Sequence, residues 1–288
     1  MKYTPLAQTL LPGLDELDAW LAGQGITQRN RLRIYRENII KTGEREKIVG
    51  DAALHAEMQK AGKLNEILAS YVDGFELVDA LVSLRAGQVK IPHDLLRRAL
   101  DGQADASRES PKNNQGRNAL FELSVGAMLA RQNLKPLLGA GNPDVEFSFE
   151  GHRILVECKR VLAENRTLPV LSEGIRQLRK QVDLSKGDVG IVAVNISRLF
   201  HSGNGFWIVP ANTDVRELLS SGISRFVDKI GDEIMRKQDA AARGALFYAV
   251  APFYVQGMGY TPGRSGTFCA FDLKRDEFLT RLASSIAV

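Results

Sequence analysis

Three residues in the stretch NPDVEFSFEGHRILVECKRV, residues 142–161, have types and spacing that could do chemistry together. Asp144 opens one run with the pattern of a strand, and Glu157 and Lys159 close the next run. Because side chains alternate along a strand, Glu157 and Lys159 are expected on the same face. A tight hairpin turn at 150–151 would bring Asp144 alongside Glu157. The spacing therefore predicts that two carboxylates and an ammonium group converge on one point.

Such a cluster of carboxylates indicates a bound cation. Neighbouring carboxylates repel one another, and burial makes each harder to ionise, so the arrangement is costly unless a positive charge lies between them. Mg²⁺, with Mn²⁺ as a substitute, suits the place because it takes one or two carboxylates together with oxygens of a substrate phosphate. A metal there would stabilise charge on the phosphate and generate hydroxide, while a lysine orients or deprotonates the water. The expected chemistry is metal-dependent hydrolysis of a phosphodiester.

A third carboxylate comes from the segment before the hairpin. Residues 119–130, ALFELSVGAMLA, form a helical run in which Glu122 is the one charged residue. A buried helix tolerates a charge that is paired, protonated or bound to a cation. We expect Glu122 to point toward the Asp144 site, as a metal ligand or as a partner of Lys159. The alternative is an ion pair with an arginine, or an exposed position at the edge of the helix.

The order of these residues along the chain resembles the PD-(D/E)xK nuclease superfamily, whose core is the restriction-endonuclease-like fold. The matching order is a helix with Glu122, a strand opened by Pro-Asp, a strand with Glu-x-Lys and a helix with Gln177, over about residues 117–196. A second triplet of this kind, at 272–274, has no Pro-Asp at hairpin distance. The conjunction of motifs, and not the triplet alone, therefore carries the resemblance.

The resemblance implies a role for each matching residue. Asp144 and Glu157 would bind the divalent metal, and Lys159 would assist the attacking water. Glu122, as a further metal ligand, and Gln177 would complete the catalytic set. The resemblance also implies DNA rather than RNA as the substrate, in a setting of restriction, repair or defence against foreign DNA.

The helix that carries Gln177 also supplies basic residues. Arg176, Arg179 and Lys180 lie beside it in LSEGIRQLRKQVD. Near a metal site they are expected to contact the phosphates of a nucleic acid, and a solvated basic face is the alternative. For a second basic face, in the N-terminal region, we favour a salt-bridged surface helix over nucleic-acid binding. That face consists of Arg29, Arg33 and Arg36.

The elements that must position these residues follow from the hydrophobic pattern. In the first third of the chain the pattern is helical throughout, and Pro92 is placed to begin the last helix. The helices expected there are 14–24, 27–43, 64–84 and 92–100. A polar linker at 106–116 is expected to separate a helical region, 1–105, from a second domain, 117–288. Deleting residues 1–105 is then expected to leave the second domain folded.

Helix and strand patterns alternate in the second domain. The expected helices are 117–132, 171–183, 213–240 and a last one from about 275, and the expected strands are 133–138, 144–149, 153–160, 188–196, 244–255 and 266–273. The predicted fold class is α/β, with a mixed central sheet flanked by helices and preceded by an all-helical region. The resemblance implies that this sheet is restriction-endonuclease-like.

Composition limits the other function classes. The 288 residues are 44% hydrophobic and 25% charged, and no run approaches the roughly 20 apolar residues of a membrane span. The N-terminus lacks the apolar stretch of a signal peptide, so a cytoplasmic location without membrane association is expected. The two cysteines are far apart and the histidines are scattered, which argues against a disulfide framework and a zinc site. The sequence lacks a GxxxxGK[ST] loop, which argues against NTP hydrolysis. A net charge of +4 mildly favours an anionic partner.

The sequence leaves two other functions open beside a nuclease whose helical region recognises substrate, a partner protein or a second copy of the chain. One is a catalytically inactive nucleic-acid-binding or assembly protein of the same fold. Divalent-metal binding that depends on Asp144 and Glu157 would distinguish the nuclease from it. The other is a helical protein-interaction module, which predicts neither metal nor nucleic-acid binding.

Overall fold

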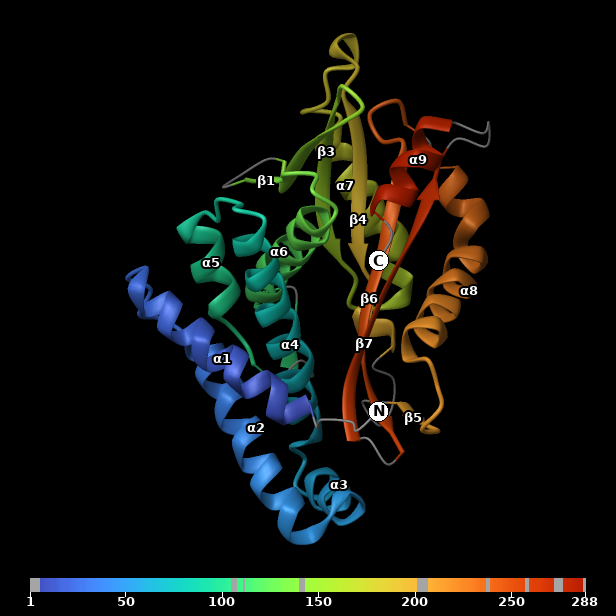
Figure 1. Ribbon diagram of the computed structural model, residues 1–288. Coiled ribbons are helices and arrows are strands. Elements are labelled where there is room, and N and C mark those ends of the chain that lie inside the picture. The colour runs from blue at the N-terminus through green and yellow to red at the C-terminus, as the bar shows by residue number, and fades with distance from the viewer. Residues whose placement is uncertain are drawn as a thin grey trace.

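Figure 1 shows helices in the N-terminal part of the chain and a sheet with further helices in the rest. The computed structural model describes residues 6–104, 108–110, 112–139, 143–200, 207–236, 239–256, 259–271 and 277–286. The N-terminal helices are α1 (Leu6–Gly23), α2 (Asn30–Val49), α3 (Asp51–Lys60), α4 (Leu64–Ala86) and α5 (His93–Leu100). The later helices are α6 (Gln115–Arg131), α7 (Thr167–Leu178), α8 (Val215–Met235) and α9 (Glu277–Ile286). The strands are β1 (Leu137–Leu138), β2 (Val145–Phe149), β3 (His152–Arg160), β4 (Val189–Asn195), β5 (Trp207–Val209), β6 (Gly244–Val255) and β7 (Gly259–Ala270).

Within the described residues, seven strands form one mixed sheet in the order β1, β2, β3, β4, β6 and β5, with β7 paired along β6. Strands β3, β4 and β6 run parallel, whereas β2 and β7 are antiparallel to their partners. Glu150 and Gly151 join β2 to β3 with φ angles of 48° and 80°, the positive pair that a two-residue hairpin turn requires. The predicted hairpin is therefore confirmed, and Val145 lies opposite Val156 in its register.

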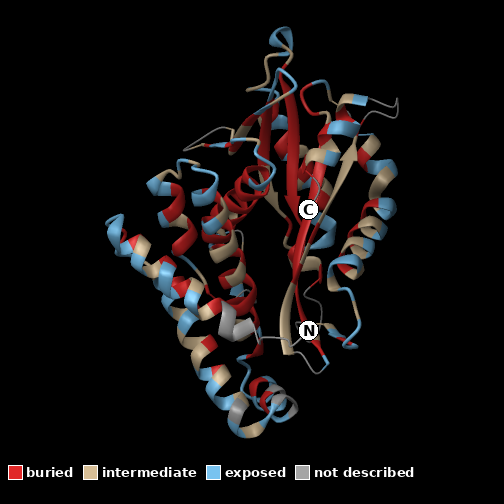
Figure 2. Cartoon of the chain, viewed as in Figure 1, coloured by how far each residue is buried: buried red, intermediate tan, exposed pale blue. Residues whose placement is uncertain are grey.

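Helices cover both faces of the sheet. On one face α6 packs on β3, and α4 packs on β6 and β7. On the other face α7 and α8 pack against Leu155 of β3 and its neighbours. Figure 2 shows the central strands and α6 almost entirely buried. None of the helices in the described ranges is both long and apolar enough to span a membrane.

The predicted α/β class, with a mixed sheet after a helical region, is confirmed, although several element bounds differ. The sequence did not predict α3 or β5. Strand β7 begins at Gly259 rather than at 266, because pairing with β6 overrides the glycines and proline that interrupt its pattern, and Pro262 lies opposite Pro252. The end of the last predicted strand, and the triplet at 272–274, fall within 272–276, outside the described residues.

The N-terminal helices and the sheet share one hydrophobic core. Leu77 of α4 belongs to the same buried cluster as Phe121 of α6 and Val156 of β3. One buried cluster thus joins the N-terminal helices to the sheet, and the two regions do not have separate cores. This changes what we expect of a chain without residues 1–105, which would lose a large part of that core.

Candidate functional site

The β2–β3 hairpin places Asp144 beside the C-terminal half of β3. Asp144 directly precedes Val145, the first residue of β2, which pairs with Val156. Its Oδ2 accepts a hydrogen bond from the backbone N–H of Cys158 at 2.7 Å. The residue between those two β3 positions is Glu157. The hairpin register thus brings the carboxyl group of Asp144 next to Glu157.

Glu157 is buried and held from two sides. Its side chain is only 1% exposed. Oε2 accepts a hydrogen bond from Lys159 Nζ at 3.0 Å, and Oε1 accepts one from Gln181 Nε2 at 2.7 Å. Lys159 lies two residues further along β3, so the contact between them places both side chains on one face of the sheet. The position of the Glu157 carboxylate is therefore fixed before any ligand arrives.

Glu122 reaches the same region from α6. Its Oε2 lies 3.7 Å from Arg98 Nη2 of α5. Burial raises the pKa of Glu122 to about 8, and the charge of Asp144 also raises it, whereas Arg98 and Lys159 act in the opposite direction. The ion pair with Arg98 is the alternative that the sequence raised for Glu122, and the charges of Asp144 and Lys159 also act on its carboxyl group.

Asp144 and Lys159 also have shifted pKa values. Burial, followed by the charge of Glu157, raises the pKa of Asp144 to about 6, although Lys159 opposes the change. Burial acts to lower the pKa of Lys159, but the charges of Glu157 and Asp144 outweigh it and raise the pKa. Near neutral pH the site thus holds a charged lysine among carboxyl groups, of which Glu122 keeps its proton. In the metal-free protein the proton on Glu122 reduces the negative charge of the site, and a bound cation would do the same in its place.

Gln181, which the sequence did not single out, contacts Glu157, and Gln177 lies one helical turn earlier near the end of α7. In the part of the chain that the structure describes, the Oε1 atoms of Gln177 and Gln181 are buried and have no hydrogen-bond partner. Amide oxygens without a donor are suitable ligands for a hard cation. Because α7 ends at Leu178, helical spacing does not extend to Gln181, and the sequence offers no signal that would have found it.

The basic residues predicted beside Gln177 all lie at the surface, and one of them is paired. Arg176 and Lys180 present their side chains to solvent. Arg179 forms an ion pair with Asp239, with 2.6 Å between Nη2 and Oδ2. The N-terminal basic face has the salt bridges expected of a surface helix. Those pairs are Arg29–Asp18 at 2.9 Å, Arg33–Glu37 at 2.9 Å and Arg36–Asp15 at 2.5 Å.

The donor atoms of the site fit a magnesium-like cation that brings its own water and phosphate ligands. Across the described ranges, no three His, Cys, Asp or Glu side chains are placed to hold one metal ion. Mg²⁺ commonly needs only one or two carboxylates from the protein, which Asp144 and Glu157 provide. The unpartnered amide oxygen of Gln181, whose amide nitrogen contacts Glu157, is a further hard donor at the same place.

Comparisons with protein-family models, with curated proteins and with solved structures gave no match. Function is therefore inferred from the side chains of the site and their surroundings. The structure brings Asp144, Glu157, Lys159 and Glu122 into one region. It adds Gln181, a residue that only the folded chain reveals as part of the site.

Burial of Glu122 should make the stability of the metal-free protein depend on pH. Its pKa is 4.5 ordinarily and about 8 in the folded chain. Over that interval the folded chain keeps a proton that the unfolded chain has lost, so the free energy of unfolding falls as pH rises. In Glu122→Gln we expect the free energy of unfolding to fall less over the same pH range. The difference should be at least about 1.4 kcal/mol, the free energy that corresponds to one pKa unit. Urea unfolding in EDTA across this pH range measures the slope.

The exposed Glu173 of α7 offers a matched control. Glu173→Gln removes the same charge from the surface and should keep the wild-type slope. A slope that is equal in wild type and in Glu122→Gln would contradict the expectation, because the proton held by the folded chain would then lie elsewhere.

Proposed function

We propose that the protein is a divalent-metal-dependent nuclease that hydrolyses phosphodiester bonds, with DNA as the substrate class favoured by the sequence resemblance. The observation that carries the proposal is the convergence of Asp144, Glu157 and Lys159 at the C-terminal end of a central strand. Buried carboxyl groups with raised pKa values beside a charged lysine are characteristic of functional sites. In open α/β sheets, ligands bind at the carboxyl ends of the parallel strands, which is where β3 places these residues.

Asp144 and Glu157 are the residues that would hold the metal. When bound there, Mg²⁺ or Mn²⁺ would neutralise charge on the scissile phosphate and lower the pKa of a water molecule. The chain prepares for this by fixing both carboxylates. The N–H of Cys158 holds Asp144, and Gln181 holds Glu157.

Lys159 is the residue that would act on the reacting atoms. Its raised pKa keeps the ammonium group charged near neutral pH. From 3.0 Å away from Glu157 Oε2, the Nζ atom would donate hydrogen bonds to the attacking water or to a phosphate oxygen. The proton thus stays on Lys159 in the free protein, and its charge offsets the negative charge that develops as the phosphodiester is attacked.

The arrangement around the site supports a restriction-endonuclease-like core. Helix α6, the β2–β3 hairpin, α7 and β4 follow one another in the order that the sequence resemblance implies. Arg176 and Lys180 extend into solvent at the end of α7, where they would contact phosphates away from the scissile one. The N-terminal helices, packed on α6, would contribute to substrate or partner recognition.

Cleavage assays with Asp144→Asn test the proposal. Plasmid, linear and single-stranded DNA and RNA are incubated with the wild type in Mg²⁺, Mn²⁺ or EDTA. Asp144→Asn keeps the size of the side chain but removes a charged ligand, so we expect metal affinity to fall about tenfold or more and cleavage to fall with it. Nucleic-acid binding should persist or strengthen, because repulsion of phosphate is relieved.

Asp228→Asn on the exposed surface of α8 is the matched control and should cleave like the wild type. Cleavage that continues in EDTA, or that is equal in wild type and Asp144→Asn, would refute the metal-dependent mechanism.

One observation favours a second candidate, a nucleic-acid-binding protein without catalysis. Both oxygens of Glu157 are already engaged, by Lys159 and by Gln181. A purely structural ion pair would look the same. This candidate predicts that the wild type binds nucleic acid in EDTA, binds no divalent metal in calorimetric titration and cleaves none of the substrates.

A further inference from the structure

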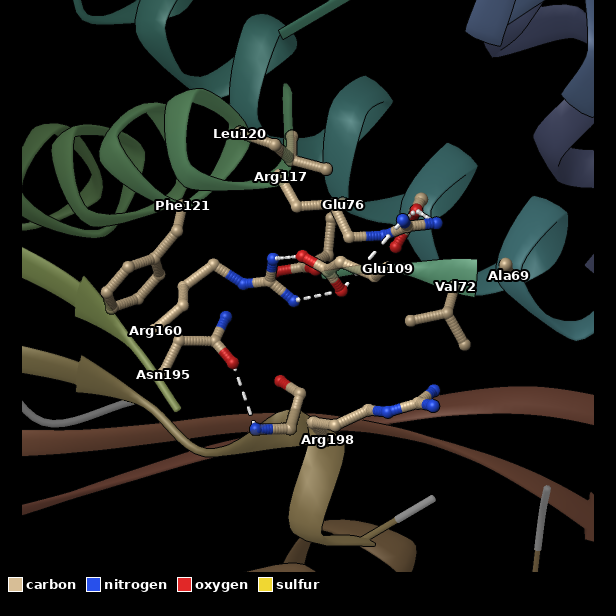
Figure 3. Close-up of a pocket in the computed structure, with 12 residues that line it drawn as sticks. Ala69, Val72, Glu76, Glu109, Arg117, Leu120, Phe121, Arg160, Asn195 and Arg198 are labelled. Atoms are coloured by element: carbon tan, nitrogen blue, oxygen red, sulfur yellow. Dashed lines mark hydrogen bonds and ion pairs between the residues drawn. The ribbon is translucent and has the colours of Figure 1, made fainter. Parts of the chain in front are cut away.

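A small cavity lies next to the candidate site, between α4, α6 and the C-terminal ends of β3 and β4 (Figure 3). With Glu109 in place its volume is about 30 Å³, which is room for a water molecule. Three arginines from different elements line it, namely Arg117 of α6, Arg160 of β3 and Arg198 of the turn Ser197–Phe200. Arginines gathered around one cavity need negatively charged groups beside them. Which acidic side chain pairs with each arginine shows where an external anion could bind instead.

Asp73 of α4 pairs with two arginines, one of which is the cavity residue Arg117. Its Oδ2 accepts hydrogen bonds from Arg31 Nη2 at 3.0 Å, Tyr35 OH at 2.8 Å and Arg117 Nε at 2.8 Å. Burial acts to raise the pKa of Asp73, but Arg117 and Arg31 outweigh it and bring the pKa to about 2. Asp73 therefore pairs directly with the α2 and α6 arginines, and its charge acts on Arg160 without a direct contact.

Glu76, in the next turn of α4, is committed to hydroxyl groups. Its Oε1 accepts hydrogen bonds from Tyr248 OH at 2.8 Å and Ser124 Oγ at 3.3 Å. Burial, followed by the charge of Asp73, raises the pKa of Glu76 to about 7. At neutral pH Glu76 thus carries only part of a negative charge. A further acidic group is needed opposite Arg160.

That group is Glu109, which belongs to the polar segment 106–116. Its side chain is 1% exposed, although the sequence predicted a solvated linker. The carboxylate forms a two-point ion pair with Arg160, in which Oε1 pairs with Nη1 and Oε2 lies 3.2 Å from Nη2. Arg117 Nη1 is 4.0 Å from the same Oε2. Figure 3 shows the carboxylate facing the Arg160 guanidinium, in the bidentate geometry with which arginine also holds phosphate.

Without Glu109, the cavity would present hydrogen-bond donors from several directions. Arg160 would keep its planar fork, and the half-buried Arg198 would add a second charge. Asn195 Oδ1 accepts a hydrogen bond from the backbone N–H of Ser197 at 2.9 Å, and its amide nitrogen points toward Arg160 (Figure 3). Convergent N–H donors with surplus positive charge form a site for an oxyanion.

The cavity adjoins the candidate nuclease site through two elements. Arg160 follows Lys159 on β3, and the lining residue Phe121 precedes Glu122 on α6. Successive side chains of a strand point to opposite faces, so Lys159 lies on the α7 side of the sheet and Arg160 on the α6 side, both at the C-terminal end of β3. A nucleic-acid strand that crosses this end of β3, with its scissile phosphate at Lys159, would carry another of its phosphates toward the cavity.

We propose that this arginine cavity binds a phosphate group of the substrate strand and that Glu109 fills the phosphate site in the free protein. The inference rests on the proposed function for the identity of the strand. Binding exchanges the Glu109–Arg160 ion pair for a phosphate held in the same way, and the Glu109 carboxylate moves into solvent. Glu109 thus competes with substrate, and its removal should tighten phosphate binding.

Titration with inorganic phosphate in EDTA tests the cavity apart from any metal-dependent cleavage. We expect Glu109→Gln to bind phosphate about tenfold more tightly than the wild type, because the competing charge is gone. Glu150→Gln removes the same charge from an exposed pair with Arg281, 2.8 Å apart, and should leave the affinity unchanged. Equal affinities in Glu109→Gln and wild type would overturn the proposal and make Glu109 a structural ion-pair partner.

Arg198→Gln tests the cavity without breaking the Glu109 pair, and it decides the question if Glu109→Gln does not fold. We expect about tenfold weaker phosphate binding than in the wild type. Arg225→Gln, on the exposed side of α8, should bind phosphate like the wild type. Unchanged affinity in Arg198→Gln would place phosphate elsewhere and overturn the proposal.

A short single-stranded DNA distinguishes a strand phosphate from free phosphate. In EDTA it should displace inorganic phosphate from Glu109→Gln. Phosphate binding that the DNA does not displace would overturn the assignment to a strand. Failure of the wild type to cleave in Mg²⁺ would instead count against the proposed function, and the phosphate titrations would still stand.

Discussion

Replacing Lys159 with alanine is expected to slow cleavage by about 10²–10³-fold, the usual worth of one donor that stabilises developing negative charge. Metal binding should persist, because Asp144 and Glu157 stay in place and Glu157 loses the ammonium group that lies 3.0 Å from its Oε2. Lys159→Ala would thus keep metal binding but lose cleavage, whereas Asp144→Asn would lose both. That contrast distinguishes a residue that acts on the water from one that binds the cation.

Calorimetric titration with Mn²⁺ beside a single-turnover cleavage assay measures both quantities. Lys229→Ala removes a lysine from an exposed ion pair with Glu164 and should match the wild type in both assays. Loss of metal binding in Lys159→Ala would show that the lysine maintains the architecture of the site. An unchanged cleavage rate would exclude it from the chemical step.

Deleting residues 1–105 is expected to abolish cooperative unfolding. The deletion removes α1 to α5, including Leu77, Leu81 and Leu84 from the core that also contains Phe121. Removal of a single buried leucine side chain typically costs about 2–5 kcal/mol, and the whole stability of a domain is about 5–15 kcal/mol. The free energy lost with these core contacts therefore exceeds the free energy of unfolding expected for the remaining chain.

Circular dichroism during urea titration provides the measurement, and point variants of α4 provide a finer test. Leu77→Ala is expected to lower the free energy of unfolding by about 2–5 kcal/mol. Val82→Ala, in the same helix but about half exposed, should change it by less than about 0.5 kcal/mol. A truncated chain that still unfolds in one sharp transition would show that the sheet and α6 to α9 form an independent domain.

Elements whose patterns are local were predictable from the sequence. The β2–β3 hairpin follows from alternation on both sides of Glu150 and Gly151, whose positive φ angles match a two-residue turn. Strand β7 was predicted too short because Pro262 and its neighbouring glycines break the alternation. Its pairing with β6 supplies hydrogen bonds that the local pattern does not reveal. Tertiary context thus decided the strand where local preference opposed it.

The same distinction applies to the candidate site. Asp144, Glu157 and Lys159 lie within one hairpin, so alternation and turn length were enough to bring them together. Glu157 meets Gln181 across 24 residues, and Arg160 meets Glu109 across 51. Contacts at such separations depend on how α7 and the segment before α6 pack on β3. The polar composition around Glu109 predicted exposure, whereas its pairing with a buried arginine decided otherwise.

The core that joins the N-terminal helices to the sheet also offers a way to search for ligands by their effect on melting. A compound that binds only the folded chain stabilises it by about 2.7 kcal/mol at one hundred times its dissociation constant. The two tryptophans report on different core clusters, since Trp20 packs on one and Trp207 on the other. Trp20 also lies beneath the Arg85 guanidinium, 5.2 Å from its ring centre. Intrinsic fluorescence during heating can therefore rank nucleotides, oligonucleotides and divalent metals without a label, even when they bind far from either tryptophan.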